Sequence, residues 1–289
     1  MMFSAKWLVC VFSYNRGAYL KNVLLSIQKY YPEFSVAIFD DGSTDPNVKK
    51  VLAETPNSTY IHVIDKPVQG SKHGGLHKMM NSAVTYAIQE NFDYVYFVQD
   101  DMQFLWRDVQ LENRVKHIFE QFNCIMCNLN FLQKIFRHDA KYELLPTPQV
   151  GVFEFLKHGV GDTGVIDVKK AKDAGLEFPY LLERDNGEYW YNKGFRLYWL
   201  AQPNLAWLPW PEAYRFKKAS KGRVHSVREL TETDMQRLRL NTGYTYLEDY
   251  ARIDAFLLKP YWQGAHPGWF TLLKIYIKYY LGVRLIKAR

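Results

Sequence analysis

An alternation of strand, loop and helix, repeated four times within about a hundred residues, constrains the fold of this chain more than any other sequence feature. Each repeat opens on a short apolar run that suits a buried strand and stops at a polar loop. The predicted strands are Trp7–Phe12, Val36–Phe39, Tyr60–Ile64 and Tyr94–Val98, with helices predicted over Tyr19–Tyr30, up to Val51 and over His77–Gln89. This order is typical of a doubly wound, mostly parallel α/β sheet with helices on both faces.

The pattern is less regular beyond residue 105, but it still predicts elements of both kinds. Residues 209–228 are basic and contain Pro, Gly and Ser, which indicates a mobile loop. The predicted elements before this loop are a helix over Val109–Phe122, a strand over Cys124–Leu129, helices over Val168–Ala174 and Leu181–Asn192, and a strand over Phe195–Trp199.

Polar side chains follow three of the predicted strands at the point where each strand ends. Ser13–Asn15 follow the first strand, Asp40 and Asp41 the second, and Asp100 and Asp101 the fourth. Ligands of open α/β sheets bind beyond the carboxyl ends of the strands. We therefore expect these three clusters to converge on one edge of the sheet and to form a binding site there.

Asp100 and Asp101 are candidates for a site that binds a divalent metal. Two adjacent carboxylates repel each other unless a cation or a hydrogen-bond donor lies nearby. A hard ion such as Mg²⁺ or Mn²⁺, held by one or two carboxylates and by substrate phosphates, removes this repulsion. Such an ion also neutralises a diphosphate as it leaves. The alternative is a strand-end turn or a helix cap that binds no ligand.

Asp40 and Asp41 are candidates for nucleoside binding. A carboxylate accepts hydrogen bonds from the imino N–H of a pyrimidine or from ribose hydroxyls, so we expect one of these two residues to contact the nucleoside. The alternative is an Asp-rich turn in which Ser43 or Asp45 caps the next helix. Lys72 lies in a glycine-bearing loop and is a candidate partner for a diphosphate.

Three carboxylates lie close together in the segment that begins at Glu183. If the site transfers a group to the hydroxyl of an acceptor, a base must take the proton of that hydroxyl. A carboxylate is able to do so. Asp185 is the first candidate for this base, with Glu188 and Glu183 behind it. The alternative for each is a solvated charge on a helix surface. The basic loop 209–228 is a candidate to close over the phosphates of a donor.

The formal net charge of +7 favours anionic partners. The sequence has no RNA-recognition motif, zinc-finger spacing or block of basic repeats, so we expect no nucleic-acid partner. Its 289 residues suit one large domain or two small ones. We expect a catalytic domain over residues 1–230, with a nucleotide-binding half (1–104) and an acceptor-binding half (105–230), and a C-terminal helical extension over 231–289.

The cysteines indicate a reducing compartment. The sequence has three of them, too few and odd in number for a disulfide framework, and the CxxC of Cys124 and Cys127 has no partners at zinc spacing. We find no signal peptide and no run of the roughly 20 apolar residues that cross a membrane. Trp269–Arg289 interleaves basic and aromatic residues, which suits contact with an anionic membrane or packing on the catalytic domain. We therefore expect a cytoplasmic protein, peripheral on the inner face of the membrane.

Five segments of the chain, within about residues 5–200, resemble the family 2 glycosyltransferases. They are similar, in this order, to the family's first loop, its Asp-Asp-Gly-Ser-Thr-Asp segment, an Asn in the following helix, its metal-binding Asp motif, and its acidic helix with the next strand. The segments are Val11–Arg16, Val36–Asp45, Asn81–Ala83, Gln99–Asp101 and Glu183–Leu197. The resemblance implies a GT-A fold, that of the nucleotide-diphospho-sugar transferases, and transfer of a sugar with inversion.

The resemblance also implies roles for individual residues. Asp41 and the loop Ser13, Tyr14 and Asn15 would surround the nucleotide. Asp100 would contact the ribose, Asp101 the metal, and Asp185 would be the base. The implied partners are a donor such as a UDP-sugar and a carbohydrate or lipid-linked acceptor, used for cell-surface polysaccharide or lipopolysaccharide.

Two departures from the family pattern leave alternatives open. Gln99 stands where the family has an acid, and Arg184 separates Glu183 from Asp185. One alternative is a non-catalytic, membrane-associated assembly protein that kept the fold. The other is a nucleotidyltransferase that makes sugar nucleotides, a class that favours more glycines in the first loop than the single Gly17 found here.

Overall fold

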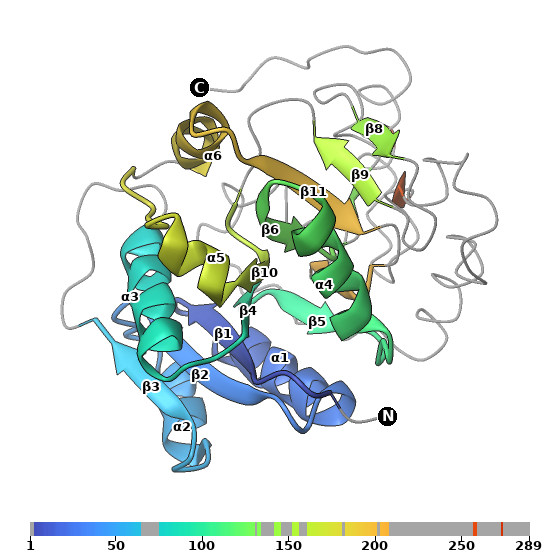
Figure 1. The fold of residues 1–289 in the computed structure, drawn as a ribbon. Helices are drawn as coiled ribbons and strands as arrows, with labels where there is room; N and C mark the ends of the chain where they lie inside the picture. The colour runs from blue at the N-terminus through green and yellow to red at the C-terminus, as the bar shows by residue number, and fades with distance from the viewer. Residues whose placement is uncertain are drawn as a thin grey trace.

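The structure is a computed structural model in which one mixed β-sheet lies between two layers of helices (Figure 1). The sheet has nine strands, and both predicted halves of the catalytic domain contribute strands to it. The model describes residues 3–64, 75–130, 132–133, 142–145, 152–155, 161–180, 183–200, 203–207, 257–258 and 273.

The four strands predicted in the first half are present and parallel to one another. All strands of the sheet run in the same direction except β10 and β9, which are antiparallel to their neighbours. In sheet order the strands are β3 (Tyr60–Val63), β2 (Ser35–Asp40), β1 (Trp7–Ser13), β4 (Tyr94–Gln99), β10 (Gly164–Asp167), β6 (Cys124–Asn128), β11 (Arg196–Leu200), β9 (Val152–Phe155) and β8 (Tyr142–Leu145).

Two short ribbons accompany the main sheet. β5 (Met102–Phe104) follows the Asp pair and is antiparallel to β12 (Leu205–Trp207). β7 (Leu132–Gln133) is parallel to β13 (Leu257–Leu258), from a distant part of the chain.

The helices divide between the two faces of the sheet because alternate residues of each strand point to opposite sides. Along β1, Val9 and Val11 belong to the core cluster on the side of α1, α2 and α4, while Leu8 and Cys10 belong to the cluster on the side of α3 and α5. The helices are α1 (Gly17–Tyr30), α2 (Pro46–Glu54), α3 (Leu76–Gln89), α4 (Leu111–Gln121), α5 (Val168–Asp173) and α6 (Glu183–Asn192).

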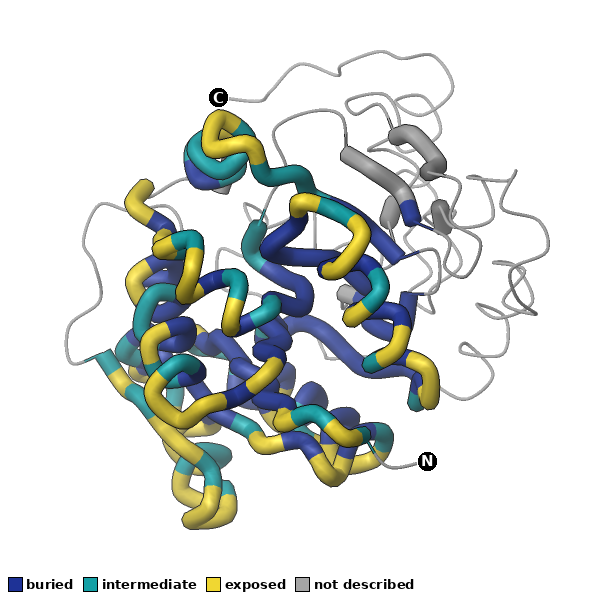
Figure 2. Tube along the Cα trace, viewed as in Figure 1, coloured by how far each residue is buried: buried dark blue, intermediate teal, exposed yellow. Residues whose placement is uncertain are grey.

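Burial decreases from the centre of the sheet to its edge. Every residue of β1 is buried, because β1 is covered by helices on both faces and flanked by β2 and β4. Edge strand β3 exposes Tyr60, Ile61 and Val63. Figure 2 shows this gradient, with buried strands inside and exposed residues along β3 and the outer sides of the helices.

The second half contains several short strands that the sequence analysis did not predict, namely β7, β8, β9, β10 and β12. β10 inserts antiparallel between β4 and β6 and joins the two halves of the sheet. It begins at Gly164, whose φ is +134° and whose hypothetical Cβ would lie 2.7 Å from the Cys127 carbonyl oxygen. Only glycine fits this backbone conformation and this close approach. The other predicted elements up to Trp199 are confirmed, with small shifts at their ends.

Several sequence features have a plain structural outcome. Cys10, Cys124 and Cys127 are buried free thiols, as predicted for the last two. Among the residues that the structure describes, no helix is long and apolar enough to cross a membrane. The predicted mobile loop 209–228 lies outside the described residues, as does Trp269–Arg289 apart from Leu273.

Candidate functional site

The three polar clusters predicted at strand ends meet at the carboxyl edge of the sheet. Asp41 donates its backbone N–H to the Ser13 carbonyl oxygen at 3.0 Å. The backbone N–H of Tyr14 donates to Asp100 Oδ2 at 3.1 Å, which joins the end of β1 to the end of β4. The structure therefore brings together the residues that the sequence predicted for one site.

Asn15 holds the first loop against the second. Its backbone is left-handed, with φ +53°, and its side-chain oxygen accepts the backbone N–H groups of Thr44 and Asp45 at 2.7 and 2.9 Å. In return, the Asn15 N–H donates to Ser43 Oγ at 2.8 Å. These contacts fix the loop, in which the ring of Tyr14 is half-exposed.

Asp40 and Asp41 have different roles despite their adjacency. Both oxygens of Asp40 accept hydrogen bonds from Ser43, from its N–H at 2.7 Å and its hydroxyl at 2.6 Å, so Asp40 closes the turn. Asp41 is only 3% exposed, and its Oδ1 has no hydrogen-bond partner among the described residues. Desolvation raises the pKa of Asp41, and the charge of Asp40 adds to the rise, while a backbone N–H opposes it.

Gly75 supplies that N–H and shapes the space around Asp41. Its N–H donates to Asp41 Oδ2 at 2.7 Å, just before α3 begins. A Cβ at Gly75 would lie 2.5 Å from Asp41 Oδ1, so a side chain here would displace the carboxylate. The candidate phosphate partner Lys72 precedes Gly75 but lies outside the described residues.

Arg16 lies between the two carboxylates of the Asp pair. Its Nη1 is 3.1 Å from Asp100 Oδ1 and 2.5 Å from Asp101 Oδ2. The charges of Asp100, first, and of Asp101 raise the pKa of the Arg16 guanidinium, which therefore stays protonated. The sequence analysis did not propose Arg16, although its place in the first loop, two residues after Tyr14, was an available signal.

The Asp pair fits a divalent metal only if a substrate supplies further ligands. No three His, Cys, Asp or Glu side chains gather into a metal site within the described part of the chain. Asp100 and Asp101 directly follow the end of β4 and so provide one or two carboxylates at this edge of the sheet. This is the ligand set with which Mg²⁺ binds together with substrate phosphates.

A buried polar cluster that the sequence analysis missed lies at the same edge, where β6 ends and β10 begins. Asn130 donates to Thr163 Oγ1 at 2.5 Å, and that hydroxyl donates to Asn128 Oδ1 at 3.0 Å. All three residues are at most 2% exposed. Their partners are distant in sequence, so no local motif indicates them.

Helix α6 carries the predicted bases Asp185, which is half-buried, and Glu188, which is exposed. The segment before the helix is held from two sides. Asn81 of α3 exchanges two hydrogen bonds with the backbone of Phe178, at 2.8 and 3.2 Å. Asn186 of α6 does the same with the backbone of Tyr180, at 3.0 and 2.8 Å.

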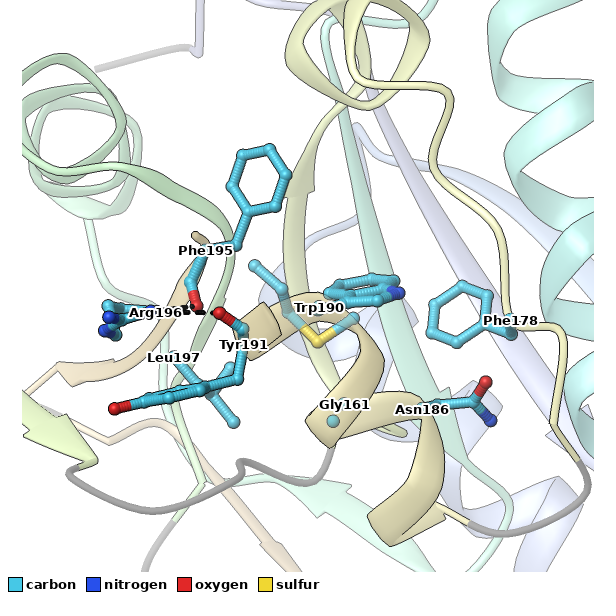
Figure 3. Close-up of a pocket in the computed structure, with 10 residues that line it drawn as sticks. Gly161, Phe178, Asn186, Trp190, Tyr191, Phe195, Arg196 and Leu197 are labelled. Atoms are coloured by element: carbon cyan, nitrogen blue, oxygen red, sulfur yellow. Dashed lines mark hydrogen bonds between the residues drawn. The ribbon is translucent and has the colours of Figure 1, made fainter. Parts of the chain in front are cut away.

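A small aromatic pocket, partly open to solvent, lies between α6 and the sheet (Figure 3). Trp190 and Phe178 form part of its wall, and the indole N–H of Trp190 donates to the Glu177 carbonyl oxygen at 2.9 Å. Gly161 and Asn186 also line it. Gln99, at the end of β4, donates to the carbonyl oxygen of Asp162, the neighbour of Gly161.

The comparisons with known proteins identify the family of the chain. The model of glycosyl transferase family 2 matches residues 8–154, which contain Ser13, Asp41 and the Asp pair. The chain belongs to this family. Its α/β sheet has the GT-A architecture that the resemblance implied. Family membership argues against the nucleotidyltransferase alternative, whereas a non-catalytic protein that kept the fold would match the same model.

The similar solved structures have low sequence identity to this chain. TarS from S. aureus, residues 1–349, is 19% identical over 70% of this chain and 60% of its own, with a TM-score of 0.48. A second TarS structure is 20% identical over 72% and 37%, with a TM-score of 0.48. The mannosyltransferase PcManGT from Pyrobaculum calidifontis, in complex with GDP-Man and Mn²⁺, is 15% identical over 98% and 71%, with a TM-score of 0.47. No curated protein sequence matches the chain.

Proposed function

We propose that this enzyme transfers a sugar from a UDP-sugar to an acceptor hydroxyl, with inversion and with the help of a divalent metal. The observation that carries the proposal is the junction of β1, β2 and β4. There, the buried carboxylate of Asp41, one oxygen of which has no hydrogen-bond partner among the described residues, lies at the same edge of the sheet as the acid pair. One end of this site suits a nucleoside and the other suits a metal-bound diphosphate.

Asp41 is the centre of the nucleoside end. Its Oδ1 is buried without a partner among the described residues, and the imino N–H of uracil is a donor that satisfies such an acceptor. Ser13 Oγ is also buried and unpaired within the described chain. The exposed ring of Tyr14 is available to stack on the base. Asn15 contributes by fixing the loop, and Asp40 by closing the turn.

Asp100, Asp101 and Lys72 belong to the phosphate end in this proposal. Asp100 contacts the ribose, Asp101 holds Mn²⁺ or Mg²⁺, and Lys72 pairs with the diphosphate. The metal would supply positive charge against the diphosphate as it leaves. The chain's own part is to hold both carboxylates at the end of β4, where Asp100 donates its backbone N–H to the Phe12 carbonyl oxygen at 2.9 Å.

Asp185 is the general base in this proposal, with Glu188 as the second candidate. The base takes the proton of the acceptor hydroxyl as its oxygen forms a bond to the anomeric carbon. The bond from that carbon to the donor's phosphate oxygen breaks in the same step, so the configuration inverts. The half-buried position of Asp185 favours it over the exposed Glu188.

The acceptor, in this proposal, is a carbohydrate or a lipid-linked glycan used for cell-surface polysaccharide or lipopolysaccharide. The net charge of +7 supports an acceptor at an anionic membrane surface. The enzyme would then act as a peripheral protein on the cytoplasmic face, with residues 1–230 as its catalytic domain and residues 231–289 as the extension that meets the membrane.

Two substitutions separate binding from transfer. Asp101→Ala removes a metal ligand, so we expect Mn²⁺-dependent binding of UDP, measured by calorimetry, to disappear. Asp185→Asn removes only the base, so UDP binding should persist while sugar transfer falls by at least about a hundredfold. Glu188→Gln is the matched control. Full transfer by Asp185→Asn together with loss in Glu188→Gln would move the base to Glu188.

A further inference from the structure

We infer that Arg16 is an internal counter-ion that occupies the metal-side carboxylate and must leave it before a divalent ion binds. The inference rests on the proposed metal site at Asp101. In addition to that site, Arg16 is a residue that competes with the metal for Asp101, and this competition couples metal binding to nucleotide binding.

The burial of the Asp pair explains why a counter-ion is needed. Asp100 is 2% and Asp101 7% exposed. Two neighbouring carboxylates with so little solvent repel each other strongly. Arg16 forms ion pairs with both of them through a single atom, Nη1. The fold therefore contains a permanent positive charge at the point where the proposed metal would supply one.

Arg16 and a metal would compete for the same atom. Nη1 of Arg16 lies 2.5 Å from Asp101 Oδ2, and divalent ions bind carboxylate oxygens at about 2.0–2.6 Å. A guanidinium and a divalent ion held this close to one oxygen would repel each other in a poorly solvated site. Metal binding at Asp101 consequently requires the guanidinium to move.

The arrangement of the first loop allows this movement. The Arg16 carbonyl oxygen accepts the Leu20 N–H at 2.9 Å, which anchors the backbone to the start of α1. The side chain, in contrast, is 36% exposed. A side-chain rotation is therefore sufficient to release Asp101 while the loop around Tyr14 and Asn15 stays in place.

A nucleoside diphosphate would provide the partner that Arg16 loses. Arginine pairs well with phosphate oxygens, and the proposed diphosphate lies next to the Asp pair. The metal then replaces Arg16 at Asp101, and the diphosphate replaces Asp101 at Arg16. This exchange predicts that Mn²⁺ binds weakly to the free protein and more tightly when UDP is present.

The test is Mn²⁺ binding to the full chain, measured by the electron paramagnetic resonance of free Mn²⁺ with and without UDP. Without UDP, we expect Arg16→Gln to bind Mn²⁺ about tenfold more tightly than wild type, within the usual range of coupling between sites. The same variant should melt at a lower temperature in chelator, because its buried carboxylates lack their cation. In Arg16→Gln, the affinity for Mn²⁺ should therefore rise while the melting temperature falls.

Two further variants make the test specific. Arg107→Gln removes an arginine that pairs with Glu33 away from the site, with Nη1–Oε2 at 2.9 Å, and should leave Mn²⁺ binding unchanged. Arg16→Lys keeps the positive charge, so it should fold like wild type and bind Mn²⁺ no more tightly. Circular dichroism confirms folding in each case.

The possible failures are distinct. If wild type binds UDP with Mn²⁺ but Arg16→Gln binds Mn²⁺ no more tightly than wild type without UDP, the counter-ion inference is wrong and the proposed function stands. If no variant binds Mn²⁺ even with UDP, the metal-assisted function and the inference both fall. Tighter Mn²⁺ binding that survives Asp101→Asn in the Arg16→Gln background would also overturn the inference.

Discussion

Asp40 and Asp41 are adjacent and of the same type, but they have different roles at the candidate site. Asp40 uses both oxygens inside its own turn, while Asp41 keeps one buried oxygen without a partner in the described structure. The residues by themselves left open which of them meets the nucleoside, and the family resemblance implied Asp41. The hydrogen bonds of the turn separate the two residues and also favour Asp41 as the ligand.

This division predicts opposite effects for two matched substitutions. Asp41→Asn should lower UDP affinity by about tenfold or more and leave the melting temperature unchanged or higher, because it removes a buried charge that lacks a donor on one oxygen. Asp40→Asn should instead reduce the free energy of unfolding by about 2 kcal/mol, because it weakens charge-assisted hydrogen bonds of the turn. Calorimetry and chemical denaturation measure the two effects. A loss of stability in Asp41→Asn with intact UDP binding would contradict the assignment.

The raised pKa of Asp41 gives this substitution a pH signature. The Asp41 carboxyl binds a proton more tightly in the folded protein than in the unfolded chain, where its pKa has the ordinary value of 3.8. The stability of wild type therefore falls as pH rises from about 4 through the folded-state pKa. Asp41→Asn lacks this loss, so its stability advantage should be largest at neutral pH and shrink in acid. A difference independent of pH would rule out the buried-charge explanation.

At the scale of elements, two asparagines position the helix that carries the proposed base. Asn81 and Asn186 each pair with the N–H and carbonyl of one backbone residue, Phe178 and Tyr180 respectively. The segment between α5 and α6 is thereby tied to α3, whose first turn follows Gly75. The orientation of α6 relative to the donor therefore depends on these two side chains.

Asn186→Ala should accordingly affect transfer more than donor binding. We expect kcat to fall by about tenfold and the KM for the donor to stay within about twofold, because a misplaced base slows the chemical step alone. Asn192→Ala, at an exposed position of the same helix, is the control and should change neither. A rise in the donor KM with unchanged kcat would show that Asn186 does not position the base.

The sequence predicts an element when the residues of that element carry the signal themselves, and it misses an element that depends on contacts with distant parts of the chain. The first four strands carry apolar runs of four to seven residues that end in polar loops, and all four were predicted. β10 has four residues and pairs antiparallel with strands from elsewhere in the chain, so no local signal marks it. The buried Asn128, Asn130 and Thr163 were missed for the same reason, whereas Arg16 was missed although its place in the first loop was an available signal.

At the scale of the whole molecule, β10 joins the first half of the sheet, which ends at β4, to the half that leads to α6. Gly164→Ala should destabilise this joint by about 3 kcal/mol, since it combines a strained φ of +134° with a Cβ 2.7 Å from a backbone oxygen. Gly175→Ala is the matched control. Its φ is +60° and its hypothetical Cβ has no neighbour within 4 Å, so only the backbone strain of about 1 kcal/mol applies. Equal losses in denaturant titrations would show that the close contact has no effect.

The central claim for the whole molecule is that the carboxyl edge of the sheet binds a nucleoside diphosphate together with a metal. Thermal unfolding with UDP, GDP, ADP and CDP, each with and without Mn²⁺, tests it most directly, because a ligand that binds only the folded state raises the melting temperature. We predict a rise with UDP that depends on Mn²⁺ and is smaller with the other nucleotides. No rise with any nucleotide, in protein shown to be folded, would contradict the account.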